Sequence, residues 1–487
     1  MTKFTVGQGE LYKTIGAAVA AAAPGDVVSV LSGVYRESVR IDKAITVEAA
    51  DGHAPVVDGG WDGQSVTDTF GGVVSVAAAG AGVRGLTVRN APGRGIGVAA
   101  SRVTVSGCFV YDCYKGGLGA NPPTGQQFSD LLIENNLIMN VGLERLVTGE
   151  GRVNGSFLFT DVIDSVIQGN TIVGGLGEGL NIDRNSRRNV FRGNRIINCA
   201  HVGIYINCAQ DNVIEGNTVI YSAARKPVGD RDDAPSGIII GDERGASQAF
   251  RPSAGNVIEG NFVFGASALF QVRNNAHNYN TALDEATRIV GNTFVAGLKT
   301  QRGIDIAENV QGRPHGAAEF AHNVIDWTNA PAGAVIAARA AARIRFHHNG
   351  WTVRPISDVR GDGDIIGDLM LTNPAAPLGA EWGTAEVGFD IDNYRPLPES
   401  PLVGAGVDGR VIGALEPLPD EPPPPPDDAG RMIELGAAVH AALVAGEQRL
   451  AVFESALALL DDGAIELRGQ LSAARDSLEL LNGLLQE

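Results

Sequence analysis

Apolar and polar residues alternate along most of this chain in runs of four or five positions, separated by Gly or Asn. The stretches NVIEGNTVI and VGIYINC show the pattern. A period of two is typical of short β-strands, and the glycine content of these runs argues against helices. We therefore expect an all-β structure over most of the chain.

The runs belong to a repeated unit that begins with Asn, usually after Gly and before an aliphatic residue. The units begin at Asn136, Asn170, Asn194, Asn217, Asn261, Asn292 and Asn323. Their spacings are 34, 24, 23, 44, 31 and 31 residues, so the longer units carry insertions. A chain that coils once per unit stacks parallel strands about 4.8 Å apart around one continuous core. We expect each Asn to bond the backbone of the next coil through its amide and to form a structural ladder.

The two ends of the repeat region look like caps. Residues 11–23 predict a short amphipathic helix over the open end of the core, and GDGDIIGDLMLTN and FDIDNYRPLPESPLVGAG predict irregular final coils. With the GDVVSVLSGVYRE run and the Gly-Asn repeats, these features resemble the pectin-lyase-like superfamily over roughly residues 4–414. The resemblance implies a right-handed parallel β-helix. It does not select a function, because lyases, glycosidases, epimerases and viral tailspikes share the fold.

The sequence divides into three parts. Residues 1–415 form the predicted β-helix, and residues 416–430 form a linker whose start, EPLPDEPPPPPDD, has seven prolines in thirteen positions and predicts an extended spacer. Residues 431–487 carry a heptad seam from Leu450 to Leu485. The seam predicts an α-helical coiled coil for oligomerisation or attachment; an intrachain hairpin that breaks at residues 461–463 is the alternative. We favour a trimer, although Leu at both seam positions also permits dimers and higher states.

Composition limits the partners. Lys and Arg total 38 against 56 Asp and Glu, and the net charge of −18 argues against nucleic acid and anionic membranes. The N-terminal residues MTKFTVGQGE show no signal segment, and no stretch reaches the roughly 20 apolar residues that a membrane span needs. We therefore expect synthesis in a cytoplasm without export by a signal peptide. The four cysteines predict buried thiols rather than disulfides or a zinc site.

Residues that face outward from stacked strands form the predicted ligand surface. Aligning the units on their Gly-Asn starts yields two outward rows, which hold the aromatic, amide and charged side chains expected to bind sugars. The predicted substrate-binding residues are Phe157, Phe159, Asn181, Tyr205, Asn207 and Arg273. The alternative for the two phenylalanines is that the inserted loop at 143–154 simply covers them.

The predicted catalytic residues are Asp183, Asp242 and Glu243. Asp183 and the Asp242-Glu243 pair lie two coils apart, roughly 10 Å between backbones, which is compatible with the carboxyl separation of roughly 6.5–9.5 Å in inverting glycosidases. An ordinary solvated strand Asp is the alternative for Asp183. The resemblance also implies a lyase reaction through a basic residue (Arg273, Arg184 or Lys115) and carboxylate-bound Ca²⁺. The acidic loops 230–233 and 358–364 could hold Ca²⁺, but turn-forming Asp and Gly explain them equally well. We otherwise expect no metal or cofactor.

Three functions are compatible with these features. The first is an oligomeric virion spike or fibre of a phage or phage-like particle, which attaches to a bacterial host, binds its capsule or other surface polysaccharide and depolymerises it. The second is a stand-alone polysaccharide lyase, glycosidase or epimerase, and the third is a non-catalytic scaffold. The sequence leaves open whether the protein is an enzyme. Its expected partners are polysaccharide, identical chains through residues 431–487 and other virion proteins.

Overall fold

The computed structural model describes residues 1–66, 71–148, 155–221, 235–243, 251–274, 279–308, 314–339 (338 and 339 without side chains), 343–375 and 390–417. The chain divides into two compact units, Met1–Leu418 and Pro419–Glu487. The second unit lies outside the described residues, and so does the predicted coiled coil at 431–487. The same holds for all but the first two residues of the predicted linker.

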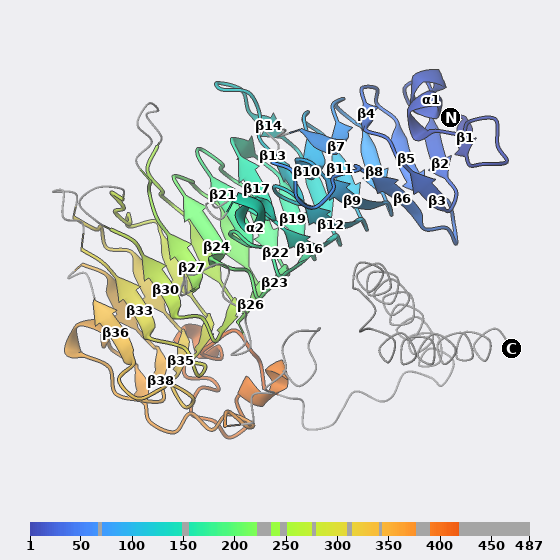
Figure 1. The fold of residues 1–487 in the computed structure, drawn as a ribbon. Coiled ribbons are helices and arrows are strands. Elements are labelled where there is room, and N and C mark those ends of the chain that lie inside the picture. The colour runs from blue at the N-terminus through green and yellow to red at the C-terminus, as the bar shows by residue number, and fades with distance from the viewer. Residues whose placement is uncertain are drawn as a thin grey trace, which may run out of the picture. The chain divides into compact units, whose positions relative to one another are not determined.

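Within the described residues, the strands form three long sheets in which every neighbouring pair is parallel, and successive coils add one strand to each (Figure 1). The first sheet contains β1 (Lys3–Val6), β2 (Val27–Val30), β5 (Thr46–Ala49), β8 (Gly82–Arg84), β11 (Thr104–Ser106), β15 (Leu132–Glu134), β19 (Val166–Gln168), β22 (Val190–Arg192), β25 (Val213–Glu215), β28 (Val257–Glu259), β31 (Arg288–Val290), β34 (Glu319–Ala321) and β37 (Arg345–His347). The second sheet contains β4 (Val39–Ile41), β7 (Gly72–Val76), β10 (Arg94–Val98), β13 (Leu118–Ala120), β17 (Phe157–Thr160), β21 (Leu180–Asp183), β24 (Val202–Asn207), β27 (Ser236–Ile240), β30 (Ala268–Val272), β33 (Arg302–Ile306) and β36 (Val335–Arg339).

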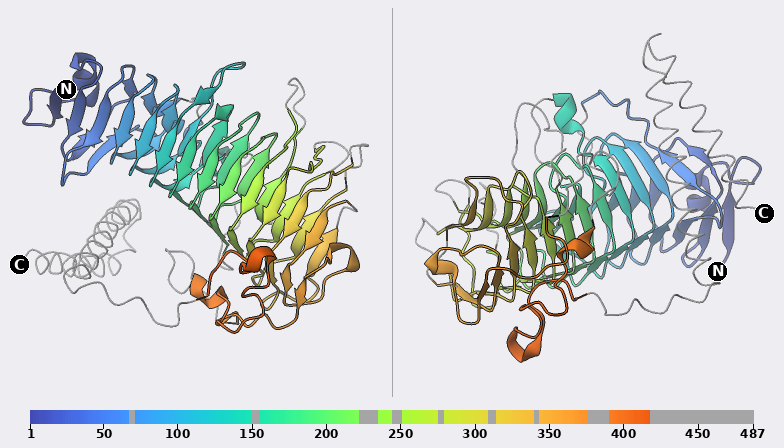
Figure 2. Two further views of the ribbon diagram at one scale, coloured as in Figure 1. Left: turned by 180° about the vertical axis from the view of Figure 1, so that it is seen from behind. Right: turned by 90° about the horizontal axis from the view of Figure 1, so that it is seen from below.

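The third sheet contains β3 (Gly33–Tyr35), β6 (Pro55–Asp58), β9 (Thr87–Ala91), β12 (Phe109–Cys113), β16 (Leu137–Val141), β20 (Thr171–Val173), β23 (Arg195–Ile197), β26 (Thr218–Ile220), β29 (Phe262–Phe264), β32 (Thr293–Val295), β35 (Val324–Asp326), β38 (Gly350–Trp351) and β39 (Ile365–Ile366). A small extra sheet pairs β14 (Phe128–Ser129) with β18 (Val162–Ile163). The strands lie side by side from one end of the stack to the other (Figure 2). The predicted parallel β-helix is thus confirmed.

The core is a column of aliphatic and aromatic side chains inside the three sheets. Ile182, Ile206 and Ile240 are fully buried and occupy the same register position on three successive strands of the second sheet. Because strand side chains alternate between faces, the residues between them point away from the column. The alignment of Leu180 with Ile204 and Ile238, expected from the repeat, is confirmed.

The asparagine ladder is confirmed along its whole predicted length. In a typical step, the backbone N–H of Asn170 and its Nδ2 donate to Oδ1 of Asn194 at 3.0 and 2.9 Å. The same contact links each pair in the series Asn136, Asn170, Asn194, Asn217, Asn261, Asn292, Asn323 and Asn349. At the last coil Asp364 replaces the amide, and its Oδ1 accepts from the backbone N–H of Asn349 at 2.8 Å.

The residue before each ladder position lies in the left-handed region of backbone conformation. Gly169 and Gly193 have φ of 62° and 60°, a conformation that glycine adopts without steric cost. His322 and His348 occupy the corresponding positions late in the chain, at φ of 57° and 51°. The Gly in the repeated Gly-Asn pair is therefore explained by the bend, and three coils depart from it, since Asn135, with φ of 54°, precedes Asn136.

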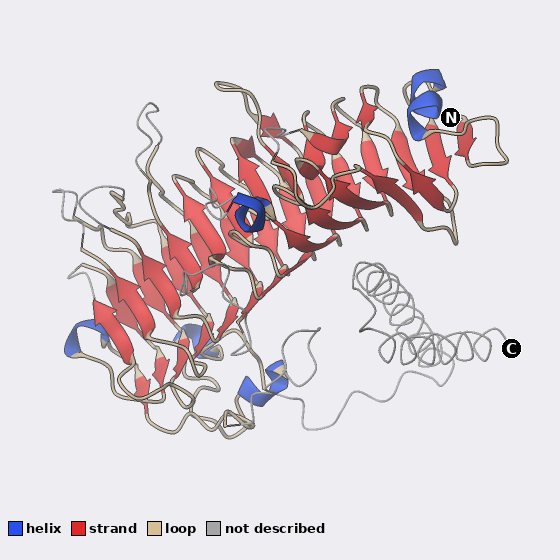
Figure 3. Cartoon of the chain, viewed as in Figure 1, coloured by secondary structure: helices blue, strands red, loops and turns tan. Residues whose placement is uncertain are grey.

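Helices occur at the ends of the stack and in one insertion (Figure 3). Helix α1 (Ile15–Ala21), shorter than predicted, buries Ile15, Ala18 and Val19 against the open end of the core. Its first N–H groups donate to the carboxylate of Glu37 at 2.8 and 2.9 Å, and Lys43 Nζ donates to its last carbonyl groups. Both ends of α1 are therefore satisfied. Helix α2 (Glu144–Thr148) lies in the insertion between β16 and β17.

The described C-terminal residues fold back over the third sheet. This segment contains the 3₁₀ turns η2 (Ile391–Tyr394) and η3 (Val407–Gly409), and η1 (Ser357–Val359) precedes it. Tyr394 packs on Phe262 and Phe264, and the backbone N–H of Ala414 donates to Oγ1 of Thr293 at 2.9 Å. All four cysteines are buried free thiols, as predicted. None of the helices in the described residues is long and apolar enough to cross a membrane.

Candidate functional site

The outward face of the second sheet carries polar side chains where β17, β21, β24, β27 and β30 lie side by side (Figure 1). The first outward row contains Leu158, Asn181, Tyr205, Ile239, Gln271 and Asp305. The second outward row begins with Thr160, Asp183 and Asn207. Polar side chains are unusual on so well buried a surface, which makes this face the candidate site.

The prediction that Phe157 and Phe159 face outward is wrong. Their register partners are Leu180 and Ile182, and both rings are fully buried in the core, 4.8 Å apart at their centroids. The predicted alignment was displaced by one residue, and such a displacement exchanges the two faces of a strand. Leu158 and Thr160 are the residues of β17 that face outward.

Asp183 lies at the centre of the polar face and is only 8% exposed. Its Oδ1 accepts from Asn207 Nδ2 at 2.7 Å, and its Oδ2 accepts from Thr160 Oγ1 and pairs with Arg184 Nε, both at 3.3 Å. Burial raises the pKa of the Asp183 carboxyl to about 7. The positive charge of Arg184 opposes this rise, and the nearby negative charges of Glu243 and Glu178 add to it. Asp183 can therefore hold or release a proton near neutral pH.

Glu243 lies on the far side of Asn207 and is exposed. Its Oε1 accepts from the phenols of Tyr205 at 2.9 Å and Tyr279 at 3.1 Å. Its backbone N–H donates to Asn207 Oδ1 at 3.0 Å, so Asn207 bridges Asp183 and Glu243. Burial raises the pKa of the Tyr205 phenol well above its ordinary value, which keeps this group a hydrogen-bond donor.

Glu178 is a third carboxylate, and the sequence reasoning missed it. It precedes β21 and is 5% exposed. Its Oε2 lies 3.5 Å from Asn181 Nδ2 and its Oε1 lies 3.7 Å from His201 Nδ1. Among the described residues, Asn181 Oδ1 and His201 Nδ1 are buried atoms that make no hydrogen bond, which is uncommon for buried polar atoms. The only sequence signal was an acidic residue in the glycine-rich turn GLGEG directly before an outward-facing strand.

Asp242 does not share this position. Its Oδ1 accepts from the backbone N–H groups of Cys208 at 3.3 Å and Ser253 at 3.0 Å, and its side chain is buried. Asp242 thus ties two backbone segments together, which argues against its predicted catalytic role. Arg273 lies beyond Tyr279, to whose hydroxyl its Nη1 donates at 3.2 Å. The Tyr279 phenol connects it to Glu243, and its Nε donates to Gln271 Oε1 at 3.3 Å.

Of the two acidic loops considered for Ca²⁺, only residues 358–364 lie within the described residues. Residues 230–233 lie outside the described residues. In the loop 358–364, both carboxylate oxygens of Asp364 are already occupied, because Oδ2 accepts from Gly361 N–H and Trp351 Nε1 while Oδ1 caps the ladder. This loop is explained by the architecture of the turn.

Comparison with known proteins places the fold. Residues 71–229 match the family model described as a right-handed β-helix region. The structure of XylC in complex with xylose shares 10% sequence identity and a TM-score of 0.51, over 76% of this chain and 87% of that chain. No curated protein matches the sequence.

Two further structures match at lower scores. Pectate lyase Pel9A has 14% identity and a TM-score of 0.48, over 86% of this chain and 96% of that one. The tailspike of E. coli bacteriophage HK620, in complex with a pentasaccharide, has 12% identity and a TM-score of 0.45, over 75% and 71%. With their three parallel sheets and the family-model match, the described residues of the first unit form a right-handed parallel β-helix.

Proposed function

We propose that this protein binds a polysaccharide across the outward face of the second sheet and hydrolyses a glycosidic bond there. The observation that supports the proposal is the grouping of three carboxylates, Glu178, Asp183 and Glu243, around two amides on that face. Carboxylates in different surroundings can take the acid and base roles that glycoside hydrolysis needs. Amides and carboxylates are also suitable partners for sugar hydroxyl groups.

In this proposal Asp183 is the general acid. With its pKa near 7, a substantial fraction of the carboxyl is protonated at neutral pH and can donate its proton to the glycosidic oxygen as the C–O bond breaks. Glu243 is the general base, because it is exposed to water and its carboxylate accepts hydrogen bonds from two phenols that hold it in place. It takes a proton from the water that attacks the anomeric carbon. Glu178 is buried and acts through Asp183, whose pKa it raises.

The spacing favours inversion of the anomeric centre. Asp183 pairs with Asn207, and Asn207 lies beside Gly241 on the next coil, so Asp183 and the start of the Glu243 turn are two strand spacings apart, about 10 Å. Asn207 connects the two residues, because its Nδ2 donates to the Asp183 carboxylate and its Oδ1 accepts from the backbone N–H of Glu243. Room for a water molecule between acid and base is characteristic of inverting enzymes.

We further propose that the protein is a spike or fibre of a phage or phage-like particle, with residues 431–487 assembling it into an oligomer. The support is the heptad seam after the proline-rich segment. Light scattering coupled to size exclusion tests the assembly, and a monomeric full-length protein would exclude this role. The reaction at Asp183 does not depend on the outcome.

The test of the reaction is incubation of the full-length protein with a panel of capsular and exopolysaccharides, followed by measurement of chain length. Asp183→Asn and Glu243→Gln are each expected to lower the rate by roughly 10²–10⁴-fold. Asp51→Asn, at an exposed turn residue, is the control and should retain full activity. Unsaturated sugar ends in the products would identify a lyase instead, and binding without shortening would leave a binding protein only.

A further inference from the structure

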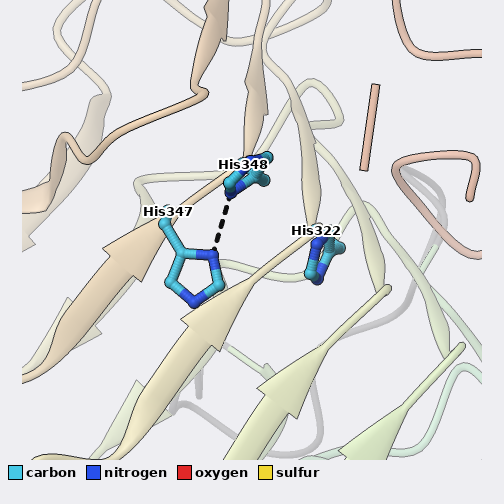
Figure 4. Close-up of side chains that lie close together, drawn as sticks. All are labelled: His322, His347 and His348. Carbon is cyan, nitrogen blue, oxygen red and sulfur yellow. Dashed lines mark hydrogen bonds between the residues drawn. The ribbon is translucent and has the colours of Figure 1, made fainter. Parts of the chain in front are cut away.

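Three histidines come together near the last coils of the β-helix, far along the chain from the carboxylates. One nitrogen from each of His322, His347 and His348 lies within 4.8 Å of the others. Figure 4 shows the three rings converging, with Nδ1 of His347 and Nδ1 of His348 3.0 Å apart. The rings of His322 and His348 stack, with their centroids 5.5 Å apart.

Two of these histidines replace a residue that the architecture prefers to be glycine. His322 and His348 directly precede the ladder residues Asn323 and Asn349, and they adopt the left-handed conformation that Gly169 and Gly193 adopt in earlier coils. A side chain in this conformation costs roughly 1–2 kcal/mol. Asn135 and Arg188 adopt the same conformation before Asn136 and Asn189, so the conformation places two imidazoles at the same position of successive coils without by itself assigning them a role.

The hydrogen bonds around the cluster orient it for metal binding. His347 Nε2 lies 3.1 Å from Glu319 Oε1, and Arg288 Nε donates to Glu319 Oε2 at 2.8 Å. An Nε2–H donated to the carboxylate leaves the lone pair of His347 on Nδ1, facing His348. A carboxylate behind a ligating imidazole is the usual arrangement that fixes the tautomer at a metal site.

We propose that His322, His347 and His348 bind one Zn²⁺ ion, which joins the last coils of the β-helix. Tetrahedral zinc with bonds of about 2.0–2.1 Å places its ligand atoms roughly 3.3 Å apart. Nδ1 of His347 and Nδ1 of His348 already lie 3.0 Å apart. Three imidazoles leave the fourth position to water. Coordination through Nδ1 of His348 requires the tautomer of that ring that carries its hydrogen on Nε2.

Zinc binding competes with one hydrogen bond at the third ligand. His322 Nε2 accepts from the backbone N–H of Val407 at 3.1 Å, and the metal takes that ring's lone pair. This hydrogen bond is only partly buried and Val407 as a residue is 43% exposed, so water can replace the imidazole as acceptor at small cost. Arg410 is the nearby positive charge that opposes the ion, whereas Glu319 favours it.

The test uses full-length protein without a histidine tag, stripped with EDTA and titrated with Zn²⁺ by calorimetry. We expect one ion per chain and a Tm increase of about 2–4 °C at excess metal. Co²⁺ should produce the intense visible absorption of a four-coordinate site. His348→Gln should weaken binding at least about tenfold, and Glu319→Gln, which keeps all three ligands, by about 10–100-fold.

His53→Gln is the matched control, because His53 is exposed and lies in an early turn; it should bind Zn²⁺ as the wild type does. Near-UV circular dichroism checks that each variant is folded. Should His348→Gln not fold, Glu319→Gln decides the question. Substoichiometric binding, or unchanged affinity in both Glu319→Gln and a folded His348→Gln, would overturn the proposal, whatever the protein does to polysaccharide.

Discussion

The asparagine ladder and the candidate site are both rows of polar side chains repeated from coil to coil, yet they differ in every other respect. In the ladder the same residue recurs, as in Asn194, Asn217 and Asn261, and each amide both donates and accepts. In the site the residue changes at each step, from Thr160 to Asp183 to Asn207. Carboxylates there lie near enough to shift the pKa of Asp183, and some buried polar atoms make no hydrogen bond.

The same residue recurs from coil to coil where every turn makes the same hydrogen bond. The residue varies where side chains on successive coils have different roles. Regularity indicates stability, because a fully paired buried polar network is stabilising. Irregularity on a buried polar row indicates chemistry, because shifted pKa values and unsatisfied donors or acceptors are costly to keep. Three further predictions test this distinction.

The largest effect is expected from breaking the ladder. Asn217→Ala removes the acceptor of two donors on Asn194 and the donor to Phe191 O and Asn261, so unfolding should become easier by roughly 3–5 kcal/mol. Urea denaturation measures the change, and Asn121→Ala at an exposed position should stay within about 0.5 kcal/mol. Activity per folded molecule should be unaffected. An equal loss in both variants would contradict the role of the ladder.

Removing the Asp183 carboxyl should favour the folded state at high pH, the opposite of what breaking the ladder does. Folded Asp183 keeps its proton to about pH 7, whereas the unfolded chain releases it near pH 4. The folded state therefore binds more protons between these values, and the wild type loses stability as pH rises from 5 to 8. Between pH 5 and pH 8 the free energy of unfolding should fall by roughly 2–3 kcal/mol more in the wild type than in Asp183→Asn. Urea unfolding at both pH values measures the difference. Parallel pH profiles for the two proteins would show that Asp183 titrates normally.

The smallest effect sharpens the role of Glu178. Glu178→Gln removes one of the two negative charges that raise the pKa of Asp183. The alkaline limb of the activity profile should then move to lower pH by about 0.5–1 unit, since the protonated acid is the active form. The maximal rate should change less than in Glu243→Gln. An unmoved limb with a lost rate would mean that Glu178 takes part in the reaction directly.

Sequence reasoning was sufficient for the fold because the repeat carries it. Gly-Asn pairs and alternating apolar runs mark each coil, and the register of β21, β24 and β27 follows from aligning them. It failed at β17, where the insertion of residues 143–154 separates the strand from its Gly-Asn start. The sequence contains no local feature that fixes the register of a strand after an insertion. An error of one residue in that register assigns every side chain of the strand to the wrong face.

The candidate site was predicted only in part for a related reason. Asp183, Tyr205 and Asn207 lie on regular strands, so their common face could be expected. Glu178 and Glu243 lie just outside the strands, where the direction of a side chain depends on the turn rather than on alternation. Asp242 and Glu243 are neighbours in sequence, and only the structure distinguishes their roles. The Asp242 carboxylate accepts hydrogen bonds from backbone N–H groups, whereas that of Glu243 is exposed to solvent and accepts from phenols.

The last residue of the ladder, Asp364, differs from the asparagines because its side chain can accept hydrogen bonds but cannot donate them. An asparagine receives a hydrogen bond from one coil and passes another to the next, whereas Asp364 only receives. Duplicating a coil anywhere between Asn136 and Asn349 would preserve the pattern, because each new amide finds partners on both sides. Beyond Asp364 an added coil would meet a carboxylate with no donor to offer. Evolution can therefore lengthen this protein from within, but it can extend it past this coil only by first restoring an amide there.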